Sequence, residues 1–406
     1  MLKALLPLFL SAAAALPGLG LRLFHPDLPA PETALLTGLA ILGASFILLW
    51  ACDVAQMDIP QTLALAVVAL IAVLPEYAVD MYFTWQAGQH PESDYAHYAI
   101  ANMTGANRLL IGVAWAAIAG IAWLKFRKAV TLTPERRTEV AFLGLATAYA
   151  FVIPIKGSLD WYDGIVLVGL YVWYIRIVSA RPCVDCELDG PAAVIGAMRP
   201  GPRRLTTCAM FLFAAGVILA DAELFSESLV ATGKVFGVDE FLLVQWLAPI
   251  ASEAPEFAVA IMFALRGNAG LALGSLLSAK LNQWTLLVGM IPGVYAASSG
   301  SFAQPIPMDA FQLHEILLTA AQSLLAVLLL VNLRLSVRGA SLLFVLFAGQ
   351  LLAPMILGAL PESVPVPHDL AVNVAFSVAY LALTAALWFA RPVAFAPLVR
   401  SMRREG

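Results

Sequence analysis

Two glutamates, Glu76 and Glu256, each follow a proline inside a long apolar stretch. Residues 74–79 read LPEYAV and residues 254–259 read APEFAV. In a membrane span, an ionisable side chain costs at least about 2.5 kcal/mol on insertion scales, so its presence indicates a function. Carboxylate oxygens are ligands that hard cations prefer. The two glutamates are therefore candidate ion ligands.

The prolines before these glutamates change the backbone of the helices that carry them. Proline has no N–H, so Pro75 would free the carbonyl of Ile71, and Pro255 would free that of Ala251. Freed carbonyls beside a carboxylate suit a hard cation, which takes several oxygen ligands. A kinked helix with a neutral glutamate bonded to a neighbour is the alternative. The matched positions of the two pairs favour the ion site.

The two Pro-Glu segments belong to a longer internal repeat. An aromatic residue follows each glutamate, and an acid precedes each segment, with Asp53 opposite Glu223. Both copies then enter an apolar span that opens with small residues, AIANMTGAN at 99–107 and LALGSLLSAK at 271–280. Five predicted spans separate equivalent elements, so the two copies have opposite orientations, as in many secondary transporters.

The composition indicates that the elements carrying these residues lie in lipid. Hydrophobic residues make up 61% of the 406 residues, and charged residues only 12%. Soluble domains average about 25% charged residues, and a soluble fold of this length has too little interior for so much apolar surface. The net charge of −4 is small, which argues against nucleic acid as a partner. The lipid bilayer is the expected partner.

The apolar stretches have the length of membrane helices, which need about 20 predominantly apolar residues. Their long uninterrupted runs lack the alternation of a membrane β-barrel. We therefore predict an all-α polytopic membrane protein, with a core of two five-helix inverted-topology repeats and proline-broken helices. The twelve predicted spans are 3–24, 33–56, 60–87, 95–124, 137–155, 160–180, 205–233, 239–266, 269–298, 310–334, 338–358 and 368–391.

The spans and the repeat divide the chain into five predicted segments. The first is an extra N-terminal helix, and Lys3 with the following Leu/Ala run and SAAAALPG also resembles a cleaved signal peptide. The first repeat, a cytoplasmic linker, the second inverted repeat, and an extra helix with a basic tail follow. The segments are 1–32, 33–180, 181–204, 205–358 and 359–406.

Arginine and lysine alternate between the predicted loops. Cytoplasmic loops of membrane proteins carry an excess of these residues. We therefore predict that both termini are cytoplasmic, in a bacterial-type inner membrane. The basic loops are 125–137, 181–204, 334–338 and 391–404, whereas 89–97, 299–309 and 361–369 are nearly free of Arg and Lys.

At these motifs the chain is similar to the calcium/cation antiporter superfamily, which includes the sodium/calcium exchangers. The resemblance covers about 33–358 and is strongest at LPE (74–76), NMTGAN (102–107) and APE (254–256), and at the acids before each repeat. It implies ten core helices in two inverted halves. It also implies exchange of Ca²⁺ against Na⁺ or H⁺ through the motif carboxylates and neighbouring polar groups.

The resemblance assigns roles to individual residues. Glu76 and Glu256 would be the central ligands, and the ligands expected for a metal ion. Asn102 and Asn107 match the two motif asparagines of the first repeat, and Ser252 matches the motif threonine of the second.

Several positions depart from the family motif. Ala72 and Val73 stand where the first motif has hydroxyl residues, so two side-chain oxygens are missing. In the second motif, Glu253 replaces a serine, Ser275 stands for the first asparagine, and Lys280 for the last. We still place Glu253 and Ser275 in the predicted ion site. Arg108 follows Asn107 where the family has an apolar residue.

Two further charges have more than one interpretation. The Lys280 ammonium could occupy the place of a cation or pair with Glu253, and a buried lysine can also lose its proton readily. It could instead snorkel or form a pair without a role in transport. Asp80 lies one turn after Glu76 on the same helix face and has either a site or proton-path role or a pairing role.

These observations favour a secondary transporter that exchanges Ca²⁺ or a related cation against Na⁺ or H⁺. The alternatives are a transport-inactive scaffold or sensor with the exchanger fold, and a transporter of another solute, such as an anion that uses Lys280 and Arg108 as counter-charges. Enzyme signatures are absent, so we expect neither catalysis nor a resident cofactor. Cys183 and Cys186 are a single loop pair, which does not predict a zinc site. The sequence leaves the oligomeric state open.

Overall fold

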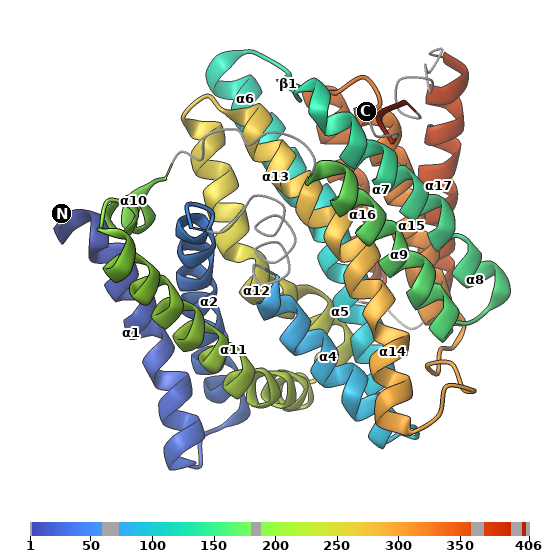
Figure 1. Cartoon of the computed structure of the whole chain (residues 1–406). Helices are drawn as coiled ribbons and strands as arrows, with labels where there is room; N and C mark the ends of the chain where they lie inside the picture. Colours follow the sequence, from blue (N-terminus) through green and yellow to red (C-terminus); the bar gives the residue numbers. More distant parts are fainter. Residues whose placement is uncertain (1, 59–72, 180–187, 359–368, 391–399, 403–406) are drawn as a thin grey trace. The chain divides into compact units, whose positions relative to one another are not determined.

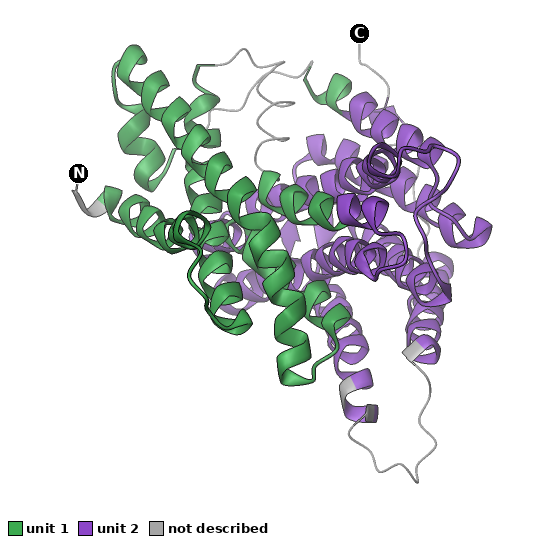
Figure 2. Cartoon of the chain, turned by 90° about the horizontal axis from the view of Figure 1, so that it is seen from below, with its two compact units in different colours: residues 1–83, 175–256 green, residues 84–174, 257–406 purple. Residues whose placement is uncertain are grey.

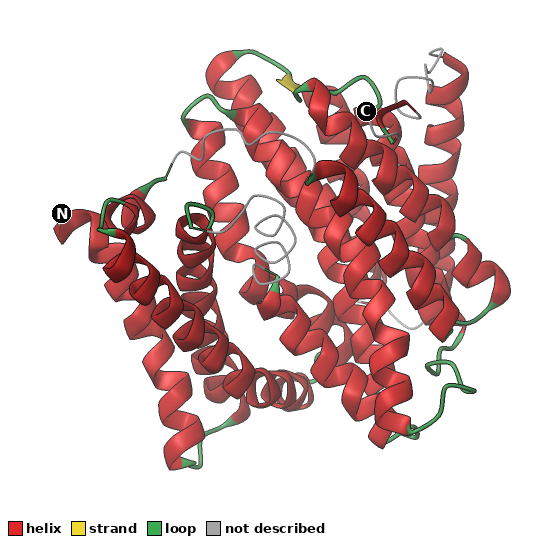
Figure 3. Cartoon of the chain, in the orientation of Figure 1, coloured by secondary structure: helices red, strands yellow, loops and turns green. Residues whose placement is uncertain are grey.

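A computed structural model of the chain describes residues 2–58, 73–179, 188–358, 369–390 and 400–402 (Figure 1). Helices account for nearly all of this part (Figure 3). Its one pair of short strands, β1 (Val130–Thr131) and β2 (Arg334–Leu335), is antiparallel, with Val130 opposite Leu335. The prediction of an all-α membrane fold is confirmed.

The helices reproduce the predicted spans closely. In the described ranges, ten helices are long and apolar enough to cross a membrane, and each coincides with a predicted span. The predicted span 60–87 has its first part outside the described residues, and only α4 (Leu74–Gln89) represents it. The predicted span 269–298 is helical, but Lys280, Asn282 and Gln283 make its middle more polar.

Some predicted features lie outside the described residues. They include the Ile71 carbonyl, Ala72, and the Cys183 and Cys186 pair.

The prolines of the two Pro-Glu segments differ in their effect on the helices that contain them. The helix α4 begins at Leu74, directly before Pro75, whereas α12 (Glu240–Leu265) continues through Pro255. A helix can continue past a proline with one hydrogen bond missing.

The chain forms two compact units, coloured separately in Figure 2. Unit 1 comprises residues 1–83 and 175–256, and unit 2 comprises residues 84–174 and 257–406. Each unit therefore takes segments from both predicted repeats. The division of the chain at 32, 180, 204 and 358 stays a prediction about the sequence. The chain passes from unit 1 to unit 2 inside both Pro-Glu helices, after Phe83 and after Glu256.

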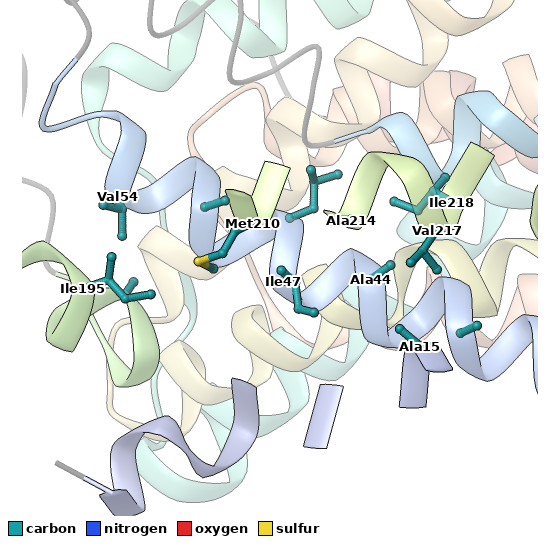
Figure 4. Close-up of a cluster of buried hydrophobic side chains, with 13 residues drawn as sticks. Ala15, Ala44, Ile47, Val54, Ile195, Met210, Ala214, Val217 and Ile218 are labelled. Carbon is teal, nitrogen blue, oxygen red and sulfur yellow. The ribbon is translucent and has the colours of Figure 1, made fainter. Parts of the chain in front are cut away.

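Unit 1 is built around α2, which packs against both α1 and α11. Buried small and branched side chains from these helices and α10 form its core, among them Ala44, Ile47 and Val217 (Figure 4). Gly43 of α2 lies against the Ser11 carbonyl of α1, where a Cβ would overlap it. Besides the first part of α4 and of α12, the unit contains α1 (Leu2–Phe24), α2 (Ala30–Ala55), α10 (Gly190–Gly196) and α11 (Pro200–Phe236).

Unit 2 has α15 at its centre, packed against α17, α7 and α5. Asp309 caps the start of α15, because its Oδ1 accepts from the backbone N–H groups of Phe311 and Gln312. Besides the second part of α4 and of α12, this unit contains most of α9 (Trp161–Val178), whose residues from 175 onward belong to unit 1. Its other helices are α5 (Tyr95–Leu109), η1 (Leu110–Trp115), α6 (Ala116–Phe126), η2 (Pro134–Arg136), α7 (Arg137–Ala150), α8 (Val152–Lys156), α13 (Ala269–Asn282), η3 (Gln283–Leu287), α14 (Val288–Ser299), α15 (Ala310–Leu330), α16 (Val337–Gly358) and α17 (Asp369–Ala390).

Candidate ion-binding site

The first Pro-Glu segment places two acids on one face of α4. Glu76 lies in the first turn of the helix, where the helix dipole favours a negative charge. Its side chain is buried, at 3% exposure, and Asp80, one turn later, is fully buried. Residues four apart on a helix are neighbours, so α4 presents two neighbouring carboxylates that are buried from solvent.

The second Pro-Glu segment places a hydroxyl and two acids on α12. Ser252 and Glu253 are buried, and Glu256 is half-buried. The Ser252 hydroxyl donates to the Pro249 carbonyl of its own helix at 3.2 Å, which leaves its oxygen able to accept or to ligate. Glu253 and Glu256 are three residues apart and share a face. This segment therefore contains the larger set of candidate oxygen ligands.

The acid before the first repeat belongs to the same unit as the second Pro-Glu segment. Asp53 on α2 and Glu256 on α12 both lie in unit 1. The Tyr82 hydroxyl of α4 donates to the Glu227 carboxylate of α11 at 2.6 Å. This hydrogen bond joins a helix of the first repeat to a helix of the second repeat within unit 1.

In unit 2 the structure brings together Asn107 on α5 and Lys280 on α13. The Lys280 ammonium donates to Asn107 Oδ1 at 2.6 Å and to the Asn107 carbonyl at 3.2 Å. It also lies 4.4 Å from the centre of the Trp284 ring. Both Asn107 and Lys280 have 0% exposure. The lysine is therefore held by oxygens and a ring in the interior, and does not snorkel to the surface.

Asn107 and Lys280 occupy equivalent positions in the two repeats. A π-helical segment begins three residues after each of them, η1 at Leu110 and η3 at Gln283. Such segments are rare and frequently mark functional sites. The hydrogen bond thus joins the residue at one motif position in the first repeat to the residue at the same motif position in the second repeat.

The remaining motif positions of unit 2 differ in exposure. Asn102 on α5 is buried, at 1% exposure, whereas Ser275 on α13 is exposed. Ser275 and Lys280 are five residues apart, and at 3.6 residues per turn this separates their directions by about 140°. The structure therefore places Ser275 on a different face of α13 from Lys280. Its assignment as an ion ligand stays a prediction.

Sequence reasoning missed a buried ion pair beside this motif. The Arg108 guanidinium of α5 donates to the Glu315 carboxylate of α15, and Asn373 of α17 donates to the other carboxylate oxygen at 2.6 Å. All three side chains are buried. The signal was the presence of an arginine and a glutamate inside apolar spans. Such charges usually pair with one another.

A second pair, also missed, lies at the start of the fourth helix of the first repeat. Arg136, in η2, donates to Glu139 on α7 at 2.8 Å and to the Ser278 hydroxyl on α13 at 3.0 Å. Its guanidinium covers Gly274, where a Cβ would be too close. In both cases, an arginine that pairs with a glutamate therefore joins the fourth helix of one repeat to the motif helix of the other, through Arg108–Glu315 and through Arg136–Ser278.

A charge cluster outside the spans concerns Asp58. Its carboxylate accepts from Arg203 at 2.8 Å twice and from Arg204 at 2.9 Å. The hydrogen bonds from Arg203, with those from Arg204 and the charges of both, lower the pKa of Asp58 to about 2. This carboxylate is a structural ion-pair partner at the end of a span.

The predicted site residues thus fall into two groups, one in each unit. Unit 1 contains the acids of α4 and α12 with Ser252, and unit 2 contains Asn102, Asn107, Ser275 and Lys280. Their convergence on one point stays a prediction. No group of three or more His, Cys, Asp or Glu side chains that could hold a metal ion occurs within the described ranges.

Comparison with known proteins adds a family and several relatives. The family described as sodium/calcium exchanger protein matches residues 32–180 and 206–356. "Putative antiporter CaxA" from Alkalimonas amylolytica is 24% identical over 259 residues, which cover 62% of this chain and 76% of that protein.

Solved structures show the same fold. The structure of the H⁺/Ca²⁺ exchanger CAX is 43% identical, with 99% of this chain and 97% of that chain covered and a TM-score of 0.89. The Ca²⁺/H⁺ antiporter protein YfkE is 17% identical, with 92% and 98% covered and a TM-score of 0.60. At that identity the second likeness concerns the fold alone.

Proposed function

Because the chain belongs to the sodium/calcium exchanger family, we propose that it is a membrane antiporter that exchanges Ca²⁺ for protons. Glu76 and Glu256 bind the transported ion in this proposal. The observation that carries it is the 43% identity with the H⁺/Ca²⁺ exchanger CAX over 99% of the chain. The lipid bilayer and inorganic cations are its partners, and the protein is a transporter without enzymatic activity.

The buried acids give this exchange a physical basis. A carboxylate removed from water is costly when charged, and either a proton or a cation relieves that cost. Glu76 and Glu256 can therefore hold Ca²⁺ when ionised or protons when neutral, but not both together. Competition of this kind makes the two fluxes opposite and obligatorily linked. Burial of Glu76 and Glu253 supports it.

The other predicted ligands add neutral oxygens. Asn102 and Ser252 would add to the coordination of Ca²⁺, which takes six to eight oxygen ligands, whereas Asn107 is bonded to Lys280. Asp80, fully buried one turn after Glu76, extends the path along which a proton leaves the site. Under this proposal both termini lie in the cytoplasm of a bacterial-type cell, and the loops rich in Arg and Lys support this orientation.

Flux measurements test the proposal. The full chain is reconstituted in vesicles, and ⁴⁵Ca²⁺ uptake and internal pH are followed under imposed H⁺ gradients and under Na⁺ gradients. Uptake driven by the H⁺ gradient, and lost in both Glu76→Gln and Glu256→Gln, is the expected result. Glu223→Gln is the matched control, because Glu223 is a half-exposed glutamate paired with Arg22.

Two outcomes would overturn the proposal. Folded protein without flux of any tested cation would favour a transport-inactive scaffold or sensor. Full Ca²⁺ uptake in both Glu76→Gln and Glu256→Gln would remove the carboxylates from the ion site.

A further inference from the structure

Lys280 lies where a family exchanger has an asparagine, and the oxygens it contacts belong to the equivalent asparagine of the other repeat. The ammonium takes both Asn107 oxygens, the side-chain Oδ1 at 2.6 Å and the backbone carbonyl at 3.2 Å. Two oxygens at these distances are a partial coordination shell for a monovalent cation. The ammonium therefore sits in a place with the chemistry of an ion site.

The groups around Lys280 are ones that favour a cation. The Asn107 amide nitrogen donates to the Met103 carbonyl at 2.8 Å, which turns its Oδ1 toward the lysine. The ring of Trp284, one turn after Lys280, lies 4.4 Å from the ammonium. Aromatic faces attract cations, most strongly when these are desolvated. Oxygens and a ring face thus converge on one buried positive charge.

The site formed by the Asn107 oxygens and the Trp284 ring cannot bind a second cation while the Lys280 ammonium is present. Asn107 Oδ1 already accepts the lysine at 2.6 Å, and a diffusible ion at that oxygen would lie next to the ammonium. At an effective dielectric constant of about 20, two unit charges about 4 Å apart repel by about 4 kcal/mol. Burial of Lys280, with 0% exposure, removes the water that would screen the repulsion.

We propose that the Lys280 ammonium is a tethered cation that permanently occupies a binding site for a monovalent cation beside Asn107. Its charge makes transport insensitive to Na⁺. This inference deepens the proposed function and rests on it for the link to transport. It makes Lys280 a specificity-determining residue. The chain then carries one positive charge of its own at a position where the family motif has an asparagine, so coupling is left to protons.

Substitutions at Lys280 test the inference through ion binding and transport. Lys280→Asn removes the ammonium and supplies the side-chain amide that the family motif has at this position. Lys280→Met removes the ammonium without supplying an oxygen. Lys280→Arg keeps the positive charge. Lys125→Asn is the matched control, because Lys125 also donates to a backbone carbonyl, that of Leu265 at 2.7 Å, but lies in an exposed position.

The first readout is binding and requires no flux. The detergent-solubilised full chain is heated in NaCl and in N-methyl-D-glucamine chloride at equal ionic strength, and the Tm is compared. Na⁺ should raise the Tm of Lys280→Asn, with an apparent affinity at least about tenfold above that of the unchanged protein, since a neighbouring unit charge is removed. The Tm of the Lys280→Arg and Lys125→Asn variants should not respond to Na⁺. Lys280→Met should respond less than Lys280→Asn.

The second readout is ⁴⁵Ca²⁺ uptake into vesicles. The unchanged protein should give the same uptake with and without Na⁺, whereas uptake by Lys280→Asn should change with the Na⁺ gradient. A folded Lys280→Asn variant without Na⁺ response in either readout would overturn the inference, as would strong Na⁺ dependence of the unchanged protein. Loss of all flux together with a Na⁺-dependent Tm in Lys280→Asn would instead count against the proposed function alone.

Discussion

Arg108 and Glu315 form a buried ion pair between α5 and α15, and Asn373 from α17 donates to the second carboxylate oxygen. Arg108 directly follows Asn107, so the pair holds the motif helix at the level of the predicted ion ligand. The Gln322 amide of α15 also donates to the Arg108 carbonyl at 3.3 Å. Two polar contacts therefore join α15 to one residue of α5.

Glu315→Gln should lower the free energy of unfolding by about 3 kcal/mol, because it leaves the Arg108 charge buried without its counter-charge. The measurement is chemical or thermal unfolding of the solubilised protein. The double variant Arg108→Met with Glu315→Gln is the control, and it should recover most of the loss. A Glu315→Gln variant within about 0.5 kcal/mol of the unchanged protein would contradict this account.

Gly18→Ala should destabilise the protein by about 1–3 kcal/mol through overpacking in unit 1. A Cβ at Gly18 of α1 would overlap the Asp221 carboxylate of α11 and the Ala40 side chain of α2. Gly20→Ala is a control in the same helix, because a Cβ there meets no atom within 4 Å. The measurement is the Tm of each variant, and Gly18→Ala should have the lower value. Equal Tm values would argue against close packing of α1 on α11.

The Asp58 ion pairs should stabilise the protein above about pH 4 and cease to do so in acid. The folded-state pKa of about 2 lies below the ordinary value of about 3.9. A group whose pKa is lowered on folding contributes stability that is present above its unfolded pKa and is lost as the pH falls through the folded pKa. Unfolding curves at pH 2–7 should therefore converge for the unchanged protein and Asp58→Asn at the acid end. A difference at pH 2 that is as large as the difference at pH 7 would exclude this linkage.

Removal of Ca²⁺ should lower the thermal stability of the unchanged protein more than that of Glu256→Gln. A ligand that binds only the folded state raises stability in proportion to the logarithm of its concentration over Kd. Loss of one carboxylate should weaken Ca²⁺ binding at least about tenfold, since hard cations depend on charged oxygen ligands. The measurement is the Tm in Ca²⁺ against the Tm in EGTA, with Glu223→Gln as the control. An unchanged Ca²⁺ effect in Glu256→Gln would remove this residue from the site.

Much of the fold could be predicted from the sequence because hydropathy is a local property. Runs of about 20 apolar residues predicted the helices, and ten of the twelve predicted spans coincide with helices that are long and apolar enough to cross a membrane. The repeated Pro-Glu segments located Glu76 and Glu256, because a charge within such a run is rare. These inferences require only residue types and their spacing along the chain.

The partners of the polar side chains were decided by the tertiary structure alone. Lys280 bonds Asn107 at a separation of 173 residues, and Arg108 bonds Glu315 at a separation of 207. Ser275, predicted as a ligand beside Lys280, lies exposed. Helix packing brings such residues together, and it depends on the shape and rotation of whole helices. Hydropathy determines that a helix lies in the membrane, but not which neighbour each of its faces meets.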